Sequence, residues 1–370
     1  MDFDFSDDQQ ALRDAVAKWV EKSYDFERRR KIVEGGGFDR GVYNELAELG
    51  LTGIYISEDH GGLGMGPVEA MVVMEELGRG IVCEPLAQAL IIGSVIQAHG
   101  SENTQSWLPR IAAGEALVVL AHQERKARYN LGVCEAHAEK ANGGYTVTAL
   151  KNVVPAGDQA DAFVVPAMLE GKMALFLVER AAPGVSTRGY HTQDEARAAD
   201  LKLDKAPAQL ITAEGLRALT YAVDLGIACT CAEGVGAMEK TLALTVEYMN
   251  QRKQFGVVIS SFQALRHRVA DMKMQLELAR SMSYYASLKL GQPEAERRQA
   301  VSRAKVQLGQ SLRFVGQQSV QLHGGIGVTD EYIGSHYFKK LTQLEMSFGD
   351  TMHHLGEVSA RMQETAGVFA

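Results

Sequence analysis

Proline is unevenly distributed along this chain of 370 residues. Five of the eight prolines fall between residues 109 and 207, and only Pro293 follows Pro207. A proline inside a helix removes a backbone hydrogen bond and clashes with the preceding turn, so long helices exclude it. The sequence therefore predicts a helical C-terminal part, preceded by a middle part of shorter elements.

The N-terminal part also carries helix signals. Ser6 and Gln9 match a capping box, and apolar residues at helical spacing follow from Leu12 to Val20. A second helix is expected to open at Pro67, since proline suits the first helical position, and to end near Gly78 or Gly80.

Long apolar seams mark the C-terminal part. Apolar residues step by four and three from Leu308 to Leu322, and Gly324-Gly325 ends that pattern. Residues 221–300 read similarly, with a break near residues 291–293. Helices of this length usually pack as a bundle.

The middle part has the signals of strands. Residues 145–149 alternate between apolar and polar side chains, and Asn142-Gly143 before them favours a hairpin. Further short apolar runs, bounded by Gly and Pro, occupy residues 162–165, 173–178 and 201–203. We expect a mainly α chain with a central antiparallel β domain: residues 1–116 helical, 117–212 β, and 213–370 a four-helix bundle.

Composition excludes several classes of protein. The net charge of −8 disfavours a general nucleic-acid binder. Four cysteines are too few for a disulfide scaffold of this size, and residues 85–101 are too short and polar to span a bilayer. The N-terminal MDFDFSDDQQ is acidic, unlike a signal peptide. We expect a cytoplasmic protein that binds neither nucleic acid nor membrane.

Two motifs suggest a ligand site at first sight, a dinucleotide-binding loop and a metal site, but neither has the required spacing. The glycine-rich GGLGMG at residues 61–66 follows a possible strand at residues 51–56, but its spacing fails the dinucleotide-loop pattern, so we expect a tight turn into a helix. His353 and His354, with His323 upstream, lack carboxylates at metal-ligand spacing, and adjacent helical side chains point about 100° apart. No metal site is predicted.

Two other motifs suit a ligand that contains a diphosphate and a ring. An arginine pairs well with phosphate oxygens and a phenylalanine stacks beside a ring, as in RKQFG at residues 252–256, followed by Phe262-Gln263. Paired glycines, as in QLHGG at residues 321–325, let a backbone approach a ligand closely. Each motif alone also fits an ordinary helix end.

Taken together, the spacing of these motifs resembles that of the acyl-CoA dehydrogenase family, flavoenzymes that oxidise the α,β-bond of acyl-CoA thioesters. The resemblance spans nearly the whole chain in the family's order. It is carried by residues 46–51, 61–64 and 75–79, by residues 252–256 with 262–263, by residues 321–327, and by residues 348–351.

The resemblance implies a helical domain, a β domain and a four-helix bundle, with FAD held between subunits. It implies an acyl-CoA substrate, an electron acceptor such as electron-transfer flavoprotein, and assembly with itself or a homologous chain. Contacts to the flavin's diphosphate and adenine side would come from Arg252, Gln254, Phe255 and Gln263. Further contacts would come from Gln321, Gly324 and Gly325, to FAD bound mainly by a neighbouring subunit, and from Thr351 and His353.

The family's catalytic base is missing at its usual place. The reaction needs a base for the α-proton while the flavin accepts a hydride. In the family this base is a glutamate, and its position here is Gly349. The alternative position on an earlier helix is about Gly226, with Asp224 two residues away. Asp350 is the nearest carboxylate, as a base or as a cap of the following helix.

The β domain also departs from the family pattern. The stretch that usually touches flavin and substrate corresponds to residues 122–130, and a Trp-Ile-Thr segment is replaced by Val153-Val154-Pro155. These departures resemble the small subunit of two-component, pimeloyl-CoA dehydrogenase-like enzymes, whose partner chain can supply the base. Two interpretations fit the basic residues of this stretch, Arg125, Lys126 and Arg128. They would meet an anionic acyl or CoA group, or they would form a solvated loop.

The motifs and the departures from the family pattern leave four candidate functions. The first is an FAD-dependent acyl-CoA dehydrogenase subunit in a heteromer. The second is a homomeric dehydrogenase that uses Asp350. The third is a non-catalytic acyl-CoA-binding or flavin-binding scaffold, against which the retained motifs argue. The weakest is a flavin monooxygenase on the same fold.

Overall fold

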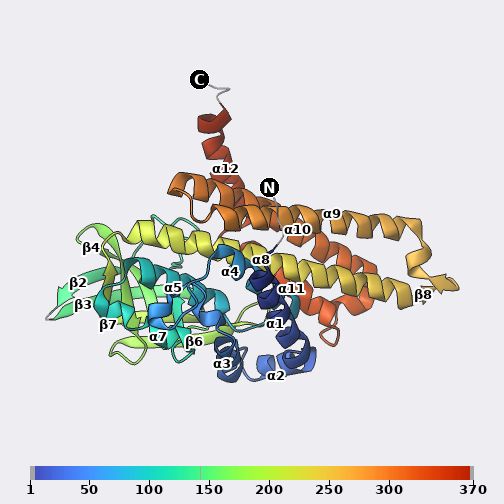
Figure 1. The fold of residues 1–370 in the computed structure, drawn as a ribbon. Coiled ribbons are helices and arrows are strands. Elements are labelled where there is room, and N and C mark those ends of the chain that lie inside the picture. Colours follow the sequence, from blue (N-terminus) through green and yellow to red (C-terminus); the bar gives the residue numbers. More distant parts are fainter. Residues whose placement is uncertain (1–4, 142, 367–370) are drawn as a thin grey trace. The chain divides into compact units, whose positions relative to one another are not determined.

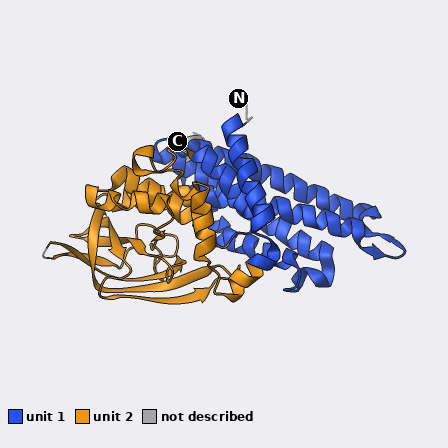
Figure 2. Ribbon diagram, turned by 60° about the horizontal axis from the view of Figure 1, so that its bottom comes forward, with its two compact units in different colours: residues 1–28, 67–82, 227–370 blue, residues 29–66, 83–226 orange. Residues whose placement is uncertain are grey.

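The computed structural model describes residues 5–141 and 143–366. The chain divides into two compact units, one of residues 1–28, 67–82 and 227–370 and the other of residues 29–66 and 83–226 (Figure 2). Two helices, α2 (Phe26–Glu34) and α8 (Gly215–Gln251), contribute residues to both units.

The first unit is a helical bundle. Its long helices α8, α9 and α10 run alongside one another, and α10 also packs against α11 and α12 (Figure 1). Its other elements are α1 (Asp7–Ser23), α4 (Pro67–Gly80), β8 (Lys253–Gln254), β9 (Val257–Val258), η3 (Ile259–Ser261), α9 (Gln263–Lys289), α10 (Glu294–His323), η4 (Gly324–Val328), α11 (Ile333–Met346) and α12 (Thr351–Ala366).

The helix boundaries of this unit confirm most of the expectations from sequence. Ser6 and Gln9 form both hydrogen bonds of the capping box, and α4 begins at Pro67 and ends at Gly80. The break near residues 291–293 separates α9 from α10. A second interruption occurs at residues 252–262, where the chain forms a small hairpin and a 3₁₀ turn instead of continuing as a helix.

A buried ion cluster joins α1, α4, α8 and α9. Glu75 is 1% exposed and pairs with Arg13, Arg79 and Arg280, while Glu239 pairs with both Arg79 and Arg280. Buried carboxylates are costly unless cations and hydrogen bonds compensate them. The cluster therefore fixes the relative positions of these four helices within the unit.

The second unit is built around a closed β-barrel. Strands β4, β2, β3, β7 and β5 form a ring that closes through β4–β5, while β1 pairs with β4 and β6 with β7. Its elements are α3 (Arg40–Glu48), η1 (Leu51–Gly53), η2 (Glu58–His60), α5 (Leu86–His99), α6 (Glu102–Gln105), α7 (Leu108–Ala112), β1 (Val118–Leu120), β2 (His137–Ala141), β3 (Gly144–Pro155), β4 (Ala162–Leu169), β5 (Lys172–Glu179), β6 (Val185–His191) and β7 (Arg197–Thr212).

The four strand patterns expected from sequence lie inside β3, β4, β5 and β7. The alternation of Val147 and Ala149 with polar neighbours places both side chains in the barrel core. Most pairings are antiparallel, but β4 pairs in parallel with β1 and with β2. β2 and β3 pair as an antiparallel hairpin with Gly143 in the turn, as expected, and Asn142 lies outside the described residues.

The possible strand at residues 51–56 is wrong. Leu51 begins a 3₁₀ turn after Gly50, whose φ is +77°. The glycine-rich loop folds back on this turn, since the N–H groups of Leu63 and Gly64 donate to the carbonyls of Gly53 and Ile56. Those carbonyls are therefore satisfied without a sheet, and the glycine-rich motif is a turn, as expected.

Helix α8 is long and apolar enough to cross a membrane by length and composition. Its most apolar window is 89% buried inside the protein, so it is a core helix. Residues 85–101, which we considered and rejected as a membrane span from sequence, mostly form the buried helix α5.

Helices α4 and α8 approach so closely that Gly236→Ala is expected to destabilise the chain. A Cβ on Gly236 would overlap the backbone carbonyl of Glu75, which cannot move without shifting α4. We expect a loss of roughly 3 kcal/mol, measured by urea unfolding. Gly356→Ala on α12, where nothing lies within 4 Å, is the matched control, and it should be neutral or stabilise by up to about 1 kcal/mol. Equal effects of the two substitutions would contradict this packing.

Candidate functional site

The first group of predicted residues lies at the turn between α8 and α9. Arg252, Gln254, Phe255 and Gln263 are all exposed, and β8 marks this end of the two helices in Figure 1. The ring of Phe255 is 90% exposed and lies edge-to-face with the ring of Phe262, with ring centroids 6.1 Å apart. Among the described residues, the guanidinium of Arg252 has no hydrogen-bond or ion-pair partner.

The end of α10 lies against the same end of α8 and α9. The rings of Tyr248 and His323 are 4.6 Å apart, and Arg268 donates to the Oε1 of Gln318 at 2.6 Å. Gln321, Gly324 and Gly325 are exposed here. Gly324 has φ +65°, and a Cβ on either glycine would meet no atom within 4 Å, so this backbone is open to a ligand. The structure thus brings together two groups of residues that were predicted to contact the flavin. One group belongs to the RKQFG motif and its sequel, and the other to the QLHGG motif.

The last group lies elsewhere, at the start of α12. Asp350 is half-buried, and its Oδ1 accepts the backbone N–H of His353 at 2.8 Å, as an N-cap residue does. Thr351 is buried and donates both its N–H and its hydroxyl to Glu345 Oε1, at 3.0 and 2.6 Å. His353 is half-buried, and its ring centroid lies 4.9 Å from that of His354.

Gly349 has no room for a side chain. Its φ is +113°, a conformation that favours glycine, and a Cβ there would lie 2.5 Å from His354 Nε2 and 2.7 Å from His353 Cδ2. The two histidine rings fill the space toward which a side chain at residue 349 would point. Residue 349, where the resemblance led us to expect a base, therefore has no carboxylate, and the histidine rings occupy the space beside it.

Buried polar side chains hold the loop around Gly349. The ammonium of Lys305 donates to the carbonyls of Leu344, Glu345 and Gly349 at 3.0, 2.7 and 2.9 Å. Burial lowers the pKa of Lys305 to about 8. His354 Nε2 donates to the Phe348 carbonyl at 3.0 Å, and its Nδ1 accepts from Ser302 at 3.3 Å.

Sequence reasoning missed Lys305. It lies between Val301 and Leu308 on the buried face of α10, where an apolar side chain would be typical. A lysine inside an apolar seam is rare unless its charge is compensated. A charged residue within the apolar pattern of α10 was therefore the sequence signal that could have identified Lys305. Lys305 and Gln321 are separated by about 24 Å of helix, so the α12 group and the α10-end group are far apart within this chain.

In the barrel unit, residues 122–130 surround a buried ion pair. Lys151 Nζ donates to Glu124 Oε1 at 2.6 Å, and Glu124 also accepts the N–H groups of Glu135 and Ala136. Burial favours the neutral acid, but these hydrogen bonds outweigh it and lower the pKa of Glu124. The pair fixes this loop to β3. Asp224, the other carboxylate considered from sequence, is fully buried in α8.

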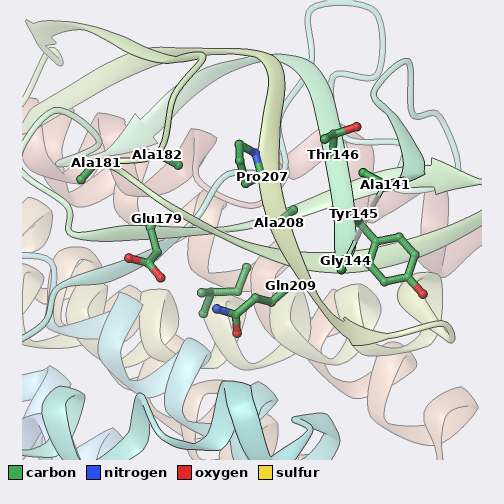
Figure 3. A pocket seen from close by; sticks show the side chains of 12 residues that line it. Ala141, Gly144, Tyr145, Thr146, Glu179, Ala181, Ala182, Pro207, Ala208 and Gln209 are labelled. Carbon is green, nitrogen blue, oxygen red and sulfur yellow. The ribbon is translucent and has the colours of Figure 1, made fainter.

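Two pockets lie on the barrel unit, and the larger of them is lined in part by Arg125 and Lys126 of the basic loop. One has a volume of about 450 Å³ and lies where β5 and β7 separate, with Glu179 and Gln209 beside small apolar side chains (Figure 3). The other, of about 710 Å³, lies over β3, β7 and β6. Among the described residues, no group of three or more His, Cys, Asp or Glu side chains is placed to hold a metal ion.

His354 predicts a pH dependence of stability. Burial lowers its pKa from 6.5 to about 3, so the unfolded chain takes up a proton that the folded chain excludes. Stability is expected to fall as pH drops from about 6.5 toward 3, by up to about 1.4 kcal/mol per pH unit from this group. His354→Gln, which keeps a donor for the Phe348 carbonyl, should flatten that slope in urea unfolding at several pH values. His267→Gln on the exposed start of α9 is the control, and an unchanged slope in His354→Gln would contradict the assignment.

Comparison with known proteins agrees with this architecture. The family model described as "Acyl-CoA dehydrogenase, N-terminal domain" matches residues 6–115, and "Acyl-CoA dehydrogenase, C-terminal domain" matches residues 213–363. "Acyl-CoA dehydrogenase FadE27" of Mycobacterium tuberculosis is 26% identical over 99% of this chain and 100% of its own length. "Acyl-CoA dehydrogenase, short-chain specific" of Megasphaera elsdenii is 29% identical over 93% of this chain and 95% of its own.

A solved structure shows the same likeness in three dimensions. It is described as the ChsE4-ChsE5 complex from Mycobacterium tuberculosis, and one of its chains has a TM-score of 0.91 and 26% identity, covering 99% of this chain and all of that one. The matched domains, the helical bundle and the central barrel agree with one another. The chain therefore belongs to the acyl-CoA dehydrogenase family, oxidoreductases that act on the CH–CH bond of acyl-CoA thioesters.

Proposed function

We propose that this chain binds FAD and works as one subunit of a two-component acyl-CoA dehydrogenase whose partner chain supplies the catalytic base. The proposal is supported above all by the lack of a carboxylate at residue 349, which is a glycine. Abstraction of an α-proton requires a base positioned within about an ångström. At the family's base position this chain has no carboxylate, and His353 and His354 occupy the adjacent space.

The exposed residues at the end of the bundle fit a flavin dinucleotide. Arg252 offers an uncompensated guanidinium to a diphosphate, Phe255 an exposed ring for stacking, and Gly324 an open backbone. We propose that these residues hold FAD together with Gln254, Gln263, Gln321, Gly325, Thr351 and His353. When bound, the flavin supplies the acceptor for the substrate's β-hydride.

The separation of the two groups supports sharing of the flavin between chains. The residues at the end of α10 and those at the start of α12 are too far apart in one chain to contact the same small ring system. A flavin whose dinucleotide rests on one chain and whose ring rests on another would use both groups. The similar solved structure described as a complex of two named chains, ChsE4 and ChsE5, supports a hetero-oligomer of this kind.

The wider setting follows from the family. We propose a homologous acyl-CoA dehydrogenase chain as the partner, as in the small subunits of two-component, pimeloyl-CoA dehydrogenase-like enzymes. We propose electron-transfer flavoprotein as the electron acceptor and the cytoplasm as the location. The second candidate function is a homomeric enzyme that uses Asp350, which has the merit of being the nearest carboxylate to the family's base position.

Flavin content tests the proposal directly. Expressed alone, the chain should hold well under one flavin and show no acyl-CoA oxidation. Purified with the homologous chain from the same genome, it should carry flavin absorbance and turn over. In that pair, Arg252→Gln should weaken flavin retention about tenfold or more, because a charge-assisted hydrogen bond to phosphate is lost.

Lys253→Gln is the control for Arg252→Gln, since it removes the same charge from the neighbouring exposed residue. One flavin per chain together with turnover by the isolated chain would overturn the two-component proposal. It would leave the dehydrogenase activity itself in place.

Asp350→Asn separates the two candidate functions. Asparagine caps a helix as well as aspartate does, so the folding stability should change by less than about 0.5 kcal/mol. In the two-component enzyme, the rate of flavin reduction by substrate should fall less than about threefold. If Asp350 is the base, that rate should fall by at least about a hundredfold with flavin still bound. Stopped-flow bleaching of the flavin spectrum distinguishes these results.

A further inference from the structure

We propose that the pocket where β5 and β7 separate is a binding site for the ammonium group of a small organic amine. The pocket has a volume of about 450 Å³, within the range of small-molecule sites (Figure 3). It lies entirely within the barrel unit, and its lining contains no residue proposed to hold FAD and none of the loop at residues 122–130. This site is therefore independent of the proposed function.

The pocket forms where two paired strands diverge. β5 pairs with β7 as far as Leu177, whose partner is Gln209. Beyond this pair, β5 continues along β4 to Glu179, while β7 follows β3 at Pro207 and Ala208. The two strands separate from this point, and the pocket occupies the space between them.

The side chains of Leu177, Glu179 and Gln209 point away from the barrel core. Their neighbours Val178 and Ala208 belong to that core, and successive side chains of a strand point to opposite faces. Since Leu177 lies directly across from Gln209, Glu179 is the diagonal neighbour of Gln209 on the outer face. Both polar side chains line the pocket, as Figure 3 shows.

Glu179 brings an uncompensated carboxylate to the pocket. Among the described residues, this carboxylate forms no ion pair and accepts no hydrogen bond. None of the described lining residues is cationic, and Arg180, which follows Glu179, is exposed outside the lining. Glu139 adds a second carboxylate on this face, directly across the β2–β3 pair from the lining residue Thr146. The pocket therefore favours a positively charged ligand.

Gln209 adds an acceptor that has no donor. Its Oε1 is shielded from solvent and meets no hydrogen-bond donor among the described residues. A buried acceptor without a partner destabilises a folded chain. A half-turn of the amide exchanges its oxygen and nitrogen, and this rotation would present the oxygen to the pocket that Gln209 lines. A ligand that donates a hydrogen bond would therefore satisfy a group that the chain leaves unsatisfied.

An ammonium group matches these features. It carries a positive charge and three N–H donors, and it has no acceptor. Glu179, Gln209 and the hydroxyl of Thr146 offer acceptors for those donors within the lining. The ring of Tyr145 and the side chain of Pro207 offer an apolar surface to the organic part of the ligand. The ligand class is therefore an amine with a short apolar body.

Isothermal titration calorimetry of the full chain with phenethylamine tests the site, near neutral pH and at low ionic strength. Glu179→Gln should weaken binding at least tenfold, because a charge-assisted hydrogen bond is lost. Gln209→Leu, which removes the amide acceptor, should weaken binding at least threefold. The control Glu115→Gln removes the same charge from an exposed position of the same unit outside the pocket, and its binding should stay within twofold.

Two further probes define which part of the ligand is recognised. Phenethyl alcohol keeps the ring without the charge and should bind at least tenfold more weakly than phenethylamine. Methylamine binding as tightly as phenethylamine would identify the ammonium group alone as the ligand, and weaker binding would identify an organic amine; both support the site.

Four results would overturn the proposal. They are no saturable binding of phenethylamine, phenethyl alcohol binding as tightly as the amine, equal losses in Glu179→Gln and Glu115→Gln, and undiminished binding in Glu179→Gln with unchanged thermal unfolding.

Discussion

The buried ammonium of Lys305 is the interaction on which the end of the helical bundle depends. Its three protons meet the carbonyls of Leu344, Glu345 and Gly349, which would otherwise lack partners where α11 ends. By holding those carbonyls, Lys305 sets the path of the loop between α11 and α12. That path turns residue 349 into a left-handed conformation and seats the histidines of α12 beside it.

The same arrangement shows that Gly349 is more than a position without a side chain, because other side chains fill the space beside it. His354, Ser302 and the Phe348 carbonyl form a neutral hydrogen-bonded chain inside the bundle. A glutamate at residue 349 would have to displace the two histidine rings beside it. Residue 349 is thus enclosed by packed histidine side chains, which fits the proposed subunit that leaves proton transfer to its partner.

The two units are stabilised in different ways. The bundle relies on the ion cluster around Glu75 and on glycines that let α4 and α8 touch, so its helices are fixed by charge and by close backbone contact. The barrel relies on an apolar interior closed by hydrogen bonds around the ring, with the buried pair of Glu124 and Lys151 tying a loop to it.

The sequence alone determined the element types and the family. Proline placement, the capping box at Ser6 and the apolar seam of α10 act locally, so they can be read from neighbouring residues. Tertiary structure alone decided the rest. Residues 51–56 have a strand-like composition but form a turn, because their carbonyls bond a loop. The roles of Lys305 and His354 depend on contacts between segments far apart in the chain, which no local pattern encodes.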